Sequence, residues 1–155
     1  MTDLRVGVVD VFVIRIVKGR WRVLTLRRGG PGRSPGSWET VHGRIEPGES
    51  PPQAARRELR EETGLTDARL FSVTVHPFYL HHTREVQMAV VFAAFVDHDA
   101  ITRGPEHDAH EWMAPGAAAK RFTWPREAEA LAHIKQLFPR GEGGVVADVL
   151  SMPTE

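Results

Sequence analysis

The sequence predicts an α+β protein with one mixed sheet and helices on its faces. Three observations lead to this class. β-branched residues are dense from Val6 to Val17, capping signals enclose a helix between Ser50 and Gly64, and apolar residues recur at helical spacing near 125–138. Strands first, one buried helix in the middle and one at the end favour a layered sheet. At 155 residues the chain is long enough to bury a core as one domain.

The first segments read as a hairpin followed by a loop. Val6–Val17 and Trp21–Leu26 are the two strands, and Lys18-Gly19 is a turn between them. Residues 29–36 are rich in glycine and proline and contain no Gly-Lys-Ser/Thr, which argues against an NTPase phosphate loop. A short extended stretch, Trp38–Val41, follows.

The central helix has clear boundaries. Ser50, Pro51 and Gln53 give an N-cap, a proline in the first turn and a capping box, while Gly64 is suited to the left-handed residue that ends a helix. We expect about three turns between them.

A projection of this helix at about 100° per residue places two acids on the inner side. Glu62 falls between Ala55 and Leu59, and Glu58 lies just beside them. Glu61 lies at the border, and the arginines fall on the far side (Arg56, Arg57 and Arg60).

The inward acids need a counter-charge. Glu58 and Glu62 repel each other at i,i+4 by roughly 0.2–0.5 kcal/mol, and inward carboxylates are rarely left unpaired. A surface helix with ion pairs such as Arg57–Glu61 is the alternative, and the inward projection argues against it. A hard divalent cation with oxygen ligands, Mg²⁺ or Mn²⁺, is the natural partner.

The remaining elements are two strands, a loop, a third strand and a helix. We expect them near Arg69–His76, Val86–Val96, Asp97–Asp108, Glu111–Met113 and Pro125–Phe138, in that order. Residues 1–140 are predicted to form the domain, and residues 141–155 a C-terminal tail of uncertain order.

Composition sets the class of partner. Formal net charge is zero, there is no cysteine, and the longest apolar run, Met88–Val96, is too short to span a bilayer. The N-terminus lacks a hydrophobic signal segment. We expect a cytoplasmic monomer or homodimer that binds neither nucleic acid polymers nor membranes.

Gly43–Leu65 resembles the Nudix box, Gly-x5-Glu-x7-Arg-Glu-U-x-Glu-Glu-x-Gly-U with U aliphatic, at every fixed position. The resemblance implies an α/β/α sandwich with the box helix and the C-terminal helix packed on a mixed sheet. It also implies Mg²⁺-dependent hydrolysis, with Mn²⁺ as a substitute, of a pyrophosphate bond in a small nucleotide.

The same resemblance implies roles for individual residues. Glu58 and Glu62 would be the main metal ligands, helped by Glu61, by Glu49 and by the backbone carbonyl of Gly43. Arg57 would orient a box glutamate. A further acid from a distant loop often completes such sites; Glu106 is the candidate here, and Glu111 is the competing one.

Other segments resemble the bacterial subgroup that acts on dihydroneopterin triphosphate and dATP. They are Trp38–Gly43, the pair Glu106-His107 and the stretch 122–126 with Thr123. His42 replaces the subgroup's threonine.

Several residues have two readings. Arg27 and Arg28 can clamp substrate phosphate or form a solvated strand end, and His42 and Thr123 are candidate substrate contacts. Trp38 and Tyr79 can stack on a base, although core packing is expected for Trp38. Trp112 is expected to pack under the last helix. The histidines His76, His81 and His82 are candidate metal ligands, but exposed loop positions are the commoner case.

Two alternative functions stay open. The first is hydrolysis of dinucleoside polyphosphates, ADP-ribose or nucleotide sugars; Pro77 and Tyr79 fall near, but not on, the positions that mark such subgroups. The second is a non-catalytic Nudix-fold nucleotide-binding or regulatory module. The intact glutamates of the box argue against it.

Overall fold

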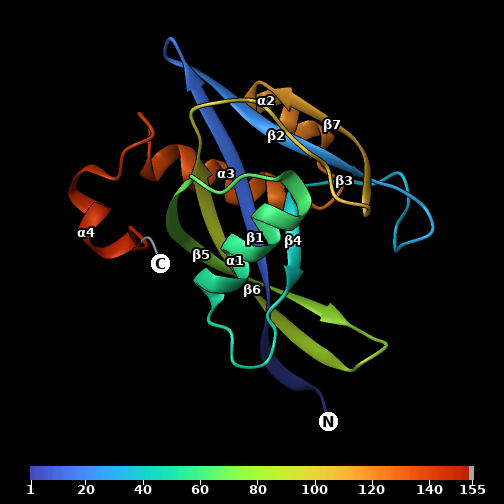
Figure 1. The fold of residues 1–155 in the computed structure, drawn as a ribbon. Helices are drawn as coiled ribbons and strands as arrows, with labels where there is room; N and C mark the ends of the chain where they lie inside the picture. The colour runs from blue at the N-terminus through green and yellow to red at the C-terminus, as the bar shows by residue number, and fades with distance from the viewer. Residues whose placement is uncertain (154–155) are drawn as a thin grey trace.

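The computed structural model describes residues 1–153 and shows one sheet between two layers of helices (Figure 1). The strands are β1 (Asp3–Val17), β2 (Arg20–Arg28), β3 (Trp38–Glu39), β4 (Val41–Arg44), β5 (Arg69–Leu80), β6 (Glu85–Phe95) and β7 (His107–Met113). The helices are α1 (Pro51–Thr63), α2 (Pro115–Arg121), α3 (Pro125–Leu137), the 3₁₀ turn η1 (Gly144–Val146) and α4 (Ala147–Leu150). No helix in this part of the chain is long and apolar enough to cross a membrane.

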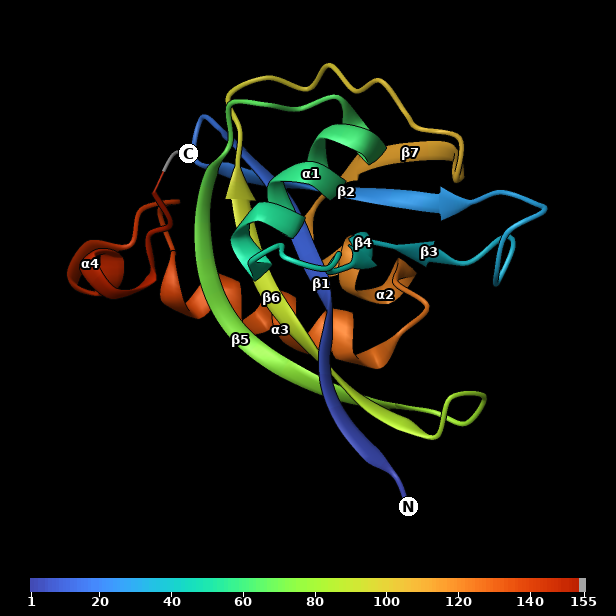
Figure 2. The ribbon, with the colours of Figure 1, turned by 60° about the horizontal axis from the view of Figure 1, so that its bottom comes forward.

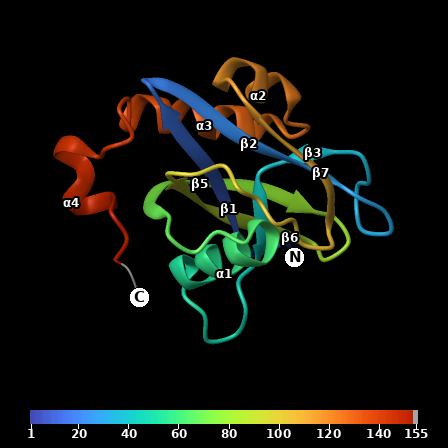
Figure 3. The ribbon, with the colours of Figure 1, turned by 45° about the horizontal axis from the view of Figure 1, so that its top comes forward.

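The sheet is mixed. Its strand order is β3-β2-β1-β6-β5, with β4 paired to β1 and β7 paired to β2. The β1–β6 pair is parallel and the other pairs are antiparallel. Box helix α1 covers one face, and α2 and α3 cover the other (Figures 2 and 3). The predicted α/β/α sandwich is confirmed.

Alternation along β1 builds the two halves of the core. Val9, Val11 and Val13 face α1, while Phe12 and Ile14 face α2 and α3, because successive side chains of a strand point to opposite faces. This placement fixes α1 directly over β1 and β4.

The predicted hairpin, box helix and last helix are confirmed. Lys18 and Gly19 both adopt positive φ, 51° and 75°, as a tight hairpin turn requires. Ser50 caps α1 with the full capping box, and Gly64 closes it at φ 78°.

Four features differ from prediction. Helix α2 was not predicted. Strands β5 and β6 form a longer hairpin than expected, and β7 begins at His107, inside the expected loop. The stretch from Trp38 is broken at Thr40 into β3 and β4, because Thr40 turns its backbone N–H to Glu127 Oε2 at 2.6 Å.

Of the predicted tail, residues 141–153 are described and pack on the domain, whereas residues 154 and 155 lie outside the described residues. Ser151 forms a β-bridge with Phe71 of β5, and the N–H of Met152 donates to the carbonyl of Leu70 at 2.8 Å. Met152 also contacts the apolar core beneath α1. The division at residue 140 stays a prediction.

Candidate functional site

Helix α1 presents its acids to a loop that crosses its C-terminal end. Gly104 donates its N–H to the carbonyl of Glu62 at 3.3 Å, and Thr102 donates to Thr63 at 2.9 Å. A Cβ on Gly104 would lie 2.4 Å from the carbonyl oxygen of Glu61, so the close approach requires glycine. The loop therefore brings Glu106 opposite the helix.

The acids line a cavity of about 310 Å³, which we call the acidic cavity. Its lining consists of Glu58, Glu61, Glu62, Gly104, Pro105 and Glu106. Glu62 is 3% exposed and Glu58 is 9% exposed, as the inward projection predicted. The structure thus gathers the three box acids with the predicted distant acid.

Glu111 lies elsewhere. It is on β7, and its carboxylate accepts a hydrogen bond from Arg121 at 2.6 Å. Glu111 lines neither this cavity nor the one beside it, whereas Glu106 lines both.

This second cavity, the basic cavity, has a volume of about 470 Å³. Its lining contains three arginines, Arg28, Arg33 and Arg44, together with His42 and Gly43. It also contains Glu58 and Glu106, which line the acidic cavity as well. The two cavities therefore adjoin each other: arginines line one, acids line the other, and the Glu58 and Glu106 side chains line both.

Arg57 forms hydrogen bonds with three of the box glutamates. Its guanidinium donates to both oxygens of Glu49, at 2.7 and 2.9 Å, and to Glu58 Oε1 at 2.6 Å. It also reaches Glu61 at 3.3 Å and the carbonyl of Arg44 at 2.7 Å. The helical projection placed Arg57 on the outer side of α1, and this is wrong for its guanidinium. A long side chain can extend well away from the side of the helix on which its Cα lies.

Glu49 is committed to Arg57 and is not part of the acidic cavity's lining. The hydrogen bonds from Arg57 lower the pKa of Glu49. Its contact with the metal stays a prediction.

Glu62 carries an unsatisfied oxygen. Its Oε2 accepts from the backbone N–H of His42 at 3.2 Å, but Oε1 is buried without a hydrogen-bond partner among the described residues. Burial, followed by the charges of Glu58, Glu39 and Glu106, raises the pKa of Glu62 well above its ordinary value. Burial also raises the pKa of Glu58, against the opposing effect of Arg57.

A divalent cation fits this donor set. An orphaned buried carboxylate oxygen among further carboxylates is unfavourable by itself and suits a hard cation with oxygen ligands. Glu62, Glu106 and His107 offer ligand atoms that all lie within 4.8 Å of one another. His107 was not predicted as a ligand.

Gly43 leaves the space that Glu58 occupies. A Cβ at this position of β4 would lie 2.0 Å from the Glu58 Cδ atom. Its neighbour His42 contacts Asp10 through Nδ1 at 2.5 Å and lines the basic cavity.

The two strand-end arginines have different surroundings. Arg28 is buried, donates from Nε to the carbonyl of Arg33 at 2.8 Å, and lines the basic cavity. Arg27 is exposed and paired with Asp108 at 2.7 Å, as the solvated reading expected.

Thr123 and Trp38 are bound to each other. Thr123 exchanges hydrogen bonds with the backbone of Trp38, and it does not line either cavity. Trp38 is half-buried rather than in the core, with the Arg121 guanidinium 4.4 Å from its ring centroid. Tyr79 is exposed.

Trp112 does not pack under the last helix. It contacts the core beneath α1, whereas the next residue of β7, Met113, faces α3. His81 and His82 are exposed in a turn as expected, but His76 lies half-buried in strand β5, so the loop reading was wrong for it.

Sequence reasoning missed Glu39, which lines neither cavity but contacts two residues of the site. It is 2% exposed on β3, where Arg33 reaches it at 3.1 Å and His107 Nε2 at 3.1 Å. Burial pushes the pKa of Glu39 up, but the hydrogen bond to His107 and the charge of Arg33 outweigh burial and lower it. An acid two residues before buried Val41 in an extended segment was the available signal.

Comparisons with known proteins agree with this geometry. A family model described as NUDIX domain matches residues 5–134. The chain is 30% identical over 132 residues to the dihydroneopterin triphosphate diphosphatase of Escherichia coli (strain K12), covering 75% of this chain and 85% of that protein. A solved structure of the E. coli dihydroneopterin triphosphate pyrophosphohydrolase superposes with a TM-score of 0.65 at 26% identity, covering 83% and 92% of the two chains.

One relative is longer. The chain is 45% identical over 115 residues to an octanoyltransferase of Myxococcus xanthus; the match covers 70% of this chain but 32% of that protein. The NUDIX match spans most of the chain and includes the acidic cavity. The chain therefore belongs to the Nudix family of hydrolases, which act on nucleotide pyrophosphates.

Proposed function

We propose that the chain hydrolyses a nucleoside triphosphate, or a similar compact triphosphate, to the monophosphate and pyrophosphate. The observation that carries this proposal is the pair of adjoining cavities, one acidic and one basic, with Glu58 and Glu106 shared between them. This arrangement suits a polyphosphate. The arginines of the basic cavity can bind its phosphate oxygens, and a cation held by the acidic cavity can neutralise its negative charge.

We assign the cation to Glu58 and Glu62, with Glu61 and Glu106 beside them and the carbonyl of Gly43 close by. Mg²⁺, or Mn²⁺ in its place, would neutralise developing charge and lower the pKa of a coordinated water. Glu62 Oε1 is the donor that most needs a partner.

The protein's own residues orient the reaction. Arg28 is fixed by the carbonyl of Arg33, and Arg44 is exposed at the rim, so both can hold phosphate oxygens of the substrate. Glu106 faces both cavities and is suited to accept a proton from the attacking water. The water oxygen then bonds to phosphorus, the anhydride P–O bond breaks, and pyrophosphate leaves with that electron pair.

Arg57 is a positioning residue in this scheme. Its hydrogen bonds to Glu49 and Glu58 hold the Glu58 carboxylate in one position. Without Arg57, this carboxylate would be free to move away from the geometry that the reaction needs.

The proposed compact substrate rests on the relatives and on the basic cavity, whose volume of about 470 Å³ is ordinary for a pocket that holds one small ligand. The protein named for dihydroneopterin triphosphate is similar over most of its length. His42 departs from that subgroup's threonine, so we place dATP before dihydroneopterin triphosphate.

Product chromatography with Mg²⁺ tests the proposal. The panel is dATP, the other dNTPs, 8-oxo-dGTP, dihydroneopterin triphosphate, ADP-ribose and diadenosine polyphosphates. We expect the highest kcat/KM for a triphosphate, with monophosphate and pyrophosphate as products and no turnover after chelation of the metal. Highest kcat/KM for ADP-ribose or a dinucleoside polyphosphate would overturn the substrate class, and no turnover of any compound would favour a binding module.

A matched pair of variants tests the phosphate contact. Arg44→Gln removes an exposed cation at the basic cavity, whereas Arg27→Gln removes an exposed cation paired with Asp108. We expect KM for the triphosphate to rise in the first variant and to stay unchanged in the second. Equal effects would count against the basic cavity as the phosphate site.

A further inference from the structure

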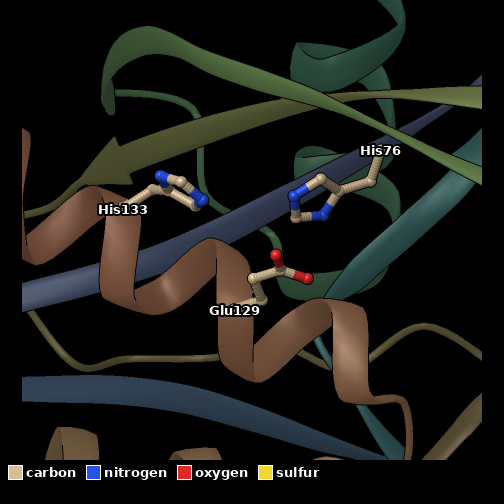
Figure 4. Close-up of side chains that lie close together, drawn as sticks. All are labelled: His76, Glu129 and His133. Carbon is tan, nitrogen blue, oxygen red and sulfur yellow. The ribbon is translucent and has the colours of Figure 1, made fainter.

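Two histidines and a glutamate converge on the face of the sheet opposite the box helix. His76 projects from β5, and Glu129 and His133 project from α3 toward the same space (Figure 4). Each offers one ligand atom, and these atoms all lie within 4.8 Å of one another. None of the three belongs to the acidic or the basic cavity.

The spacing on the helix is suited to joint binding. Glu129 and His133 are four residues apart, so they lie on the same side of α3, one turn from each other. His76 lies across from them on the strand against which α3 packs.

One polar atom in this cluster lacks a partner. Nδ1 of His76 is buried, and no residue in the range 1–153 hydrogen-bonds to it. The rings of His76 and His133 are not stacked: their centroids are 6.1 Å apart and their planes meet at 63°. Nδ1 of His76 is thus a buried, unpartnered ring nitrogen in a side chain that lies beside two further donor groups, and a metal ion is one way to satisfy such a cluster.

We propose that His76, Glu129 and His133 bind a zinc-class divalent cation with its fourth position open to solvent. Two imidazoles and one carboxylate suit Zn²⁺ and its transition-metal neighbours, whereas Mg²⁺ prefers oxygen ligands and keeps several waters. This site is therefore chemically different from the cation site of the box.

The geometry needs only a small closure. In a tetrahedral site with Zn–ligand bonds of about 2.0–2.1 Å, the ligand atoms are about 3.3 Å apart. In the present structure the three ligand atoms lie within 4.8 Å of one another. Glu129 and His133 are both exposed, so their side chains can rotate toward His76 without displacing the core.

The bound cation would link α3 to β5, the last strand in the sheet order. Because it binds the folded chain and bridges two separate elements, it would stabilise the fold by mass action. This stabilising effect is separate from hydrolysis at the acidic cavity.

Zinc titration of the full chain tests the site. The titration is performed with saturating Mg²⁺, so that the box glutamates are occupied, and is followed by calorimetry and by thermal unfolding. We expect one Zn²⁺ per chain and a higher melting temperature. Co²⁺ in place of Zn²⁺ should show the visible absorption of tetrahedral coordination.

Three variants make the result specific. Glu129→Gln and His133→Ala should each weaken Zn²⁺ binding by at least about tenfold, since even outer contacts of metal ligands cost about 10–100-fold. His98→Ala is the control, because it removes a half-exposed histidine that pairs with Asp67. All three variants should keep the Mg²⁺-dependent activity of the wild type.

Absence of Zn²⁺ binding in the presence of Mg²⁺ would overturn the proposal. So would zinc binding that Glu129→Gln and His133→Ala leave unchanged, or that His98→Ala weakens equally. Loss of zinc binding only in Glu62→Gln would place the ion in the acidic cavity instead.

Discussion

Replacement of Gly43 by alanine should impair hydrolysis while the protein stays folded. Gly43 lies in β4, paired with Val9, and an added Cβ would be 2.0 Å from Cδ and 2.1 Å from Oε1 of Glu58. Ordinary contact begins near 3.4 Å, so the carboxylate must retreat by about 1.4 Å, the difference between 3.4 and 2.0. The backbone carbonyl of residue 43 is kept.

The displacement has a calculable consequence. Glu58 would lose its 2.6 Å hydrogen bond from Arg57 and its position between the two cavities. A misplacement of about 1 Å can cost about 10²-fold in rate, equivalent to about 2.7 kcal/mol at about 1.36 kcal/mol per tenfold. We expect kcat to fall about 100-fold and the affinity for Mn²⁺ to fall with it.

The assay is kcat for the best triphosphate at saturating Mg²⁺, with Mn²⁺ titration and urea unfolding on the same samples. Gly116→Ala is the matched control, because its Cβ would meet nothing within 4 Å in α2. It should keep both kcat and stability. Wild-type kcat in Gly43→Ala, or an equal loss in Gly116→Ala, would refute the steric argument.

The other predictions concern acids. Glu58→Gln and Glu62→Gln should each lower kcat by orders of magnitude; near-native rates at saturating Mg²⁺ would sink their assignment. Because the pKa of Glu62 is raised, its charge opposes folding as pH rises above the unfolded value, so Glu62→Gln should raise the melting temperature of the metal-free protein at pH 7. Glu106→Gln should lose more activity than Glu111→Gln; the reverse order in a side-by-side assay would identify the wrong acid. The pKa of Glu39 is lowered, so its contribution to stability is present above about pH 4.3 and is lost as pH falls through its folded value. Thermal unfolding of Glu39→Gln should accordingly depend less on pH in that acidic range, and an unchanged pH dependence would contradict the ion-pair account.

Local signals explain what the sequence predicts well. The box helix has a capping box and a terminal glycine, so both ends are encoded within a few residues. Helix α2 lacks these signals: its N-cap, Ala114, makes no side-chain hydrogen bond. The start of β7 was missed because His107 is polar and becomes a strand residue only by pairing with Arg28 of β2.

The candidate site divides in the same way. Glu58 and Glu62 were found because helical periodicity alone turns both inward. Glu39 was missed because its partners, Arg33 and His107, come from a loop and a strand that only the folded sheet brings together. Periodicity also gives the direction of a Cβ atom but not the reach of a side chain as long as Arg57.

The contact of Ser151 and Met152 with β5 has a consequence for solubility. A strand at the margin of a sheet offers free N–H and C=O groups to any passing strand, and apolar neighbours make such pairing stronger. The bridge to Phe71 and the hydrogen bond to Leu70 occupy part of this margin with the chain's own backbone. A version cut at residue 140 would expose that margin together with its apolar side chains, and it would be prone to self-association even if its active site were intact.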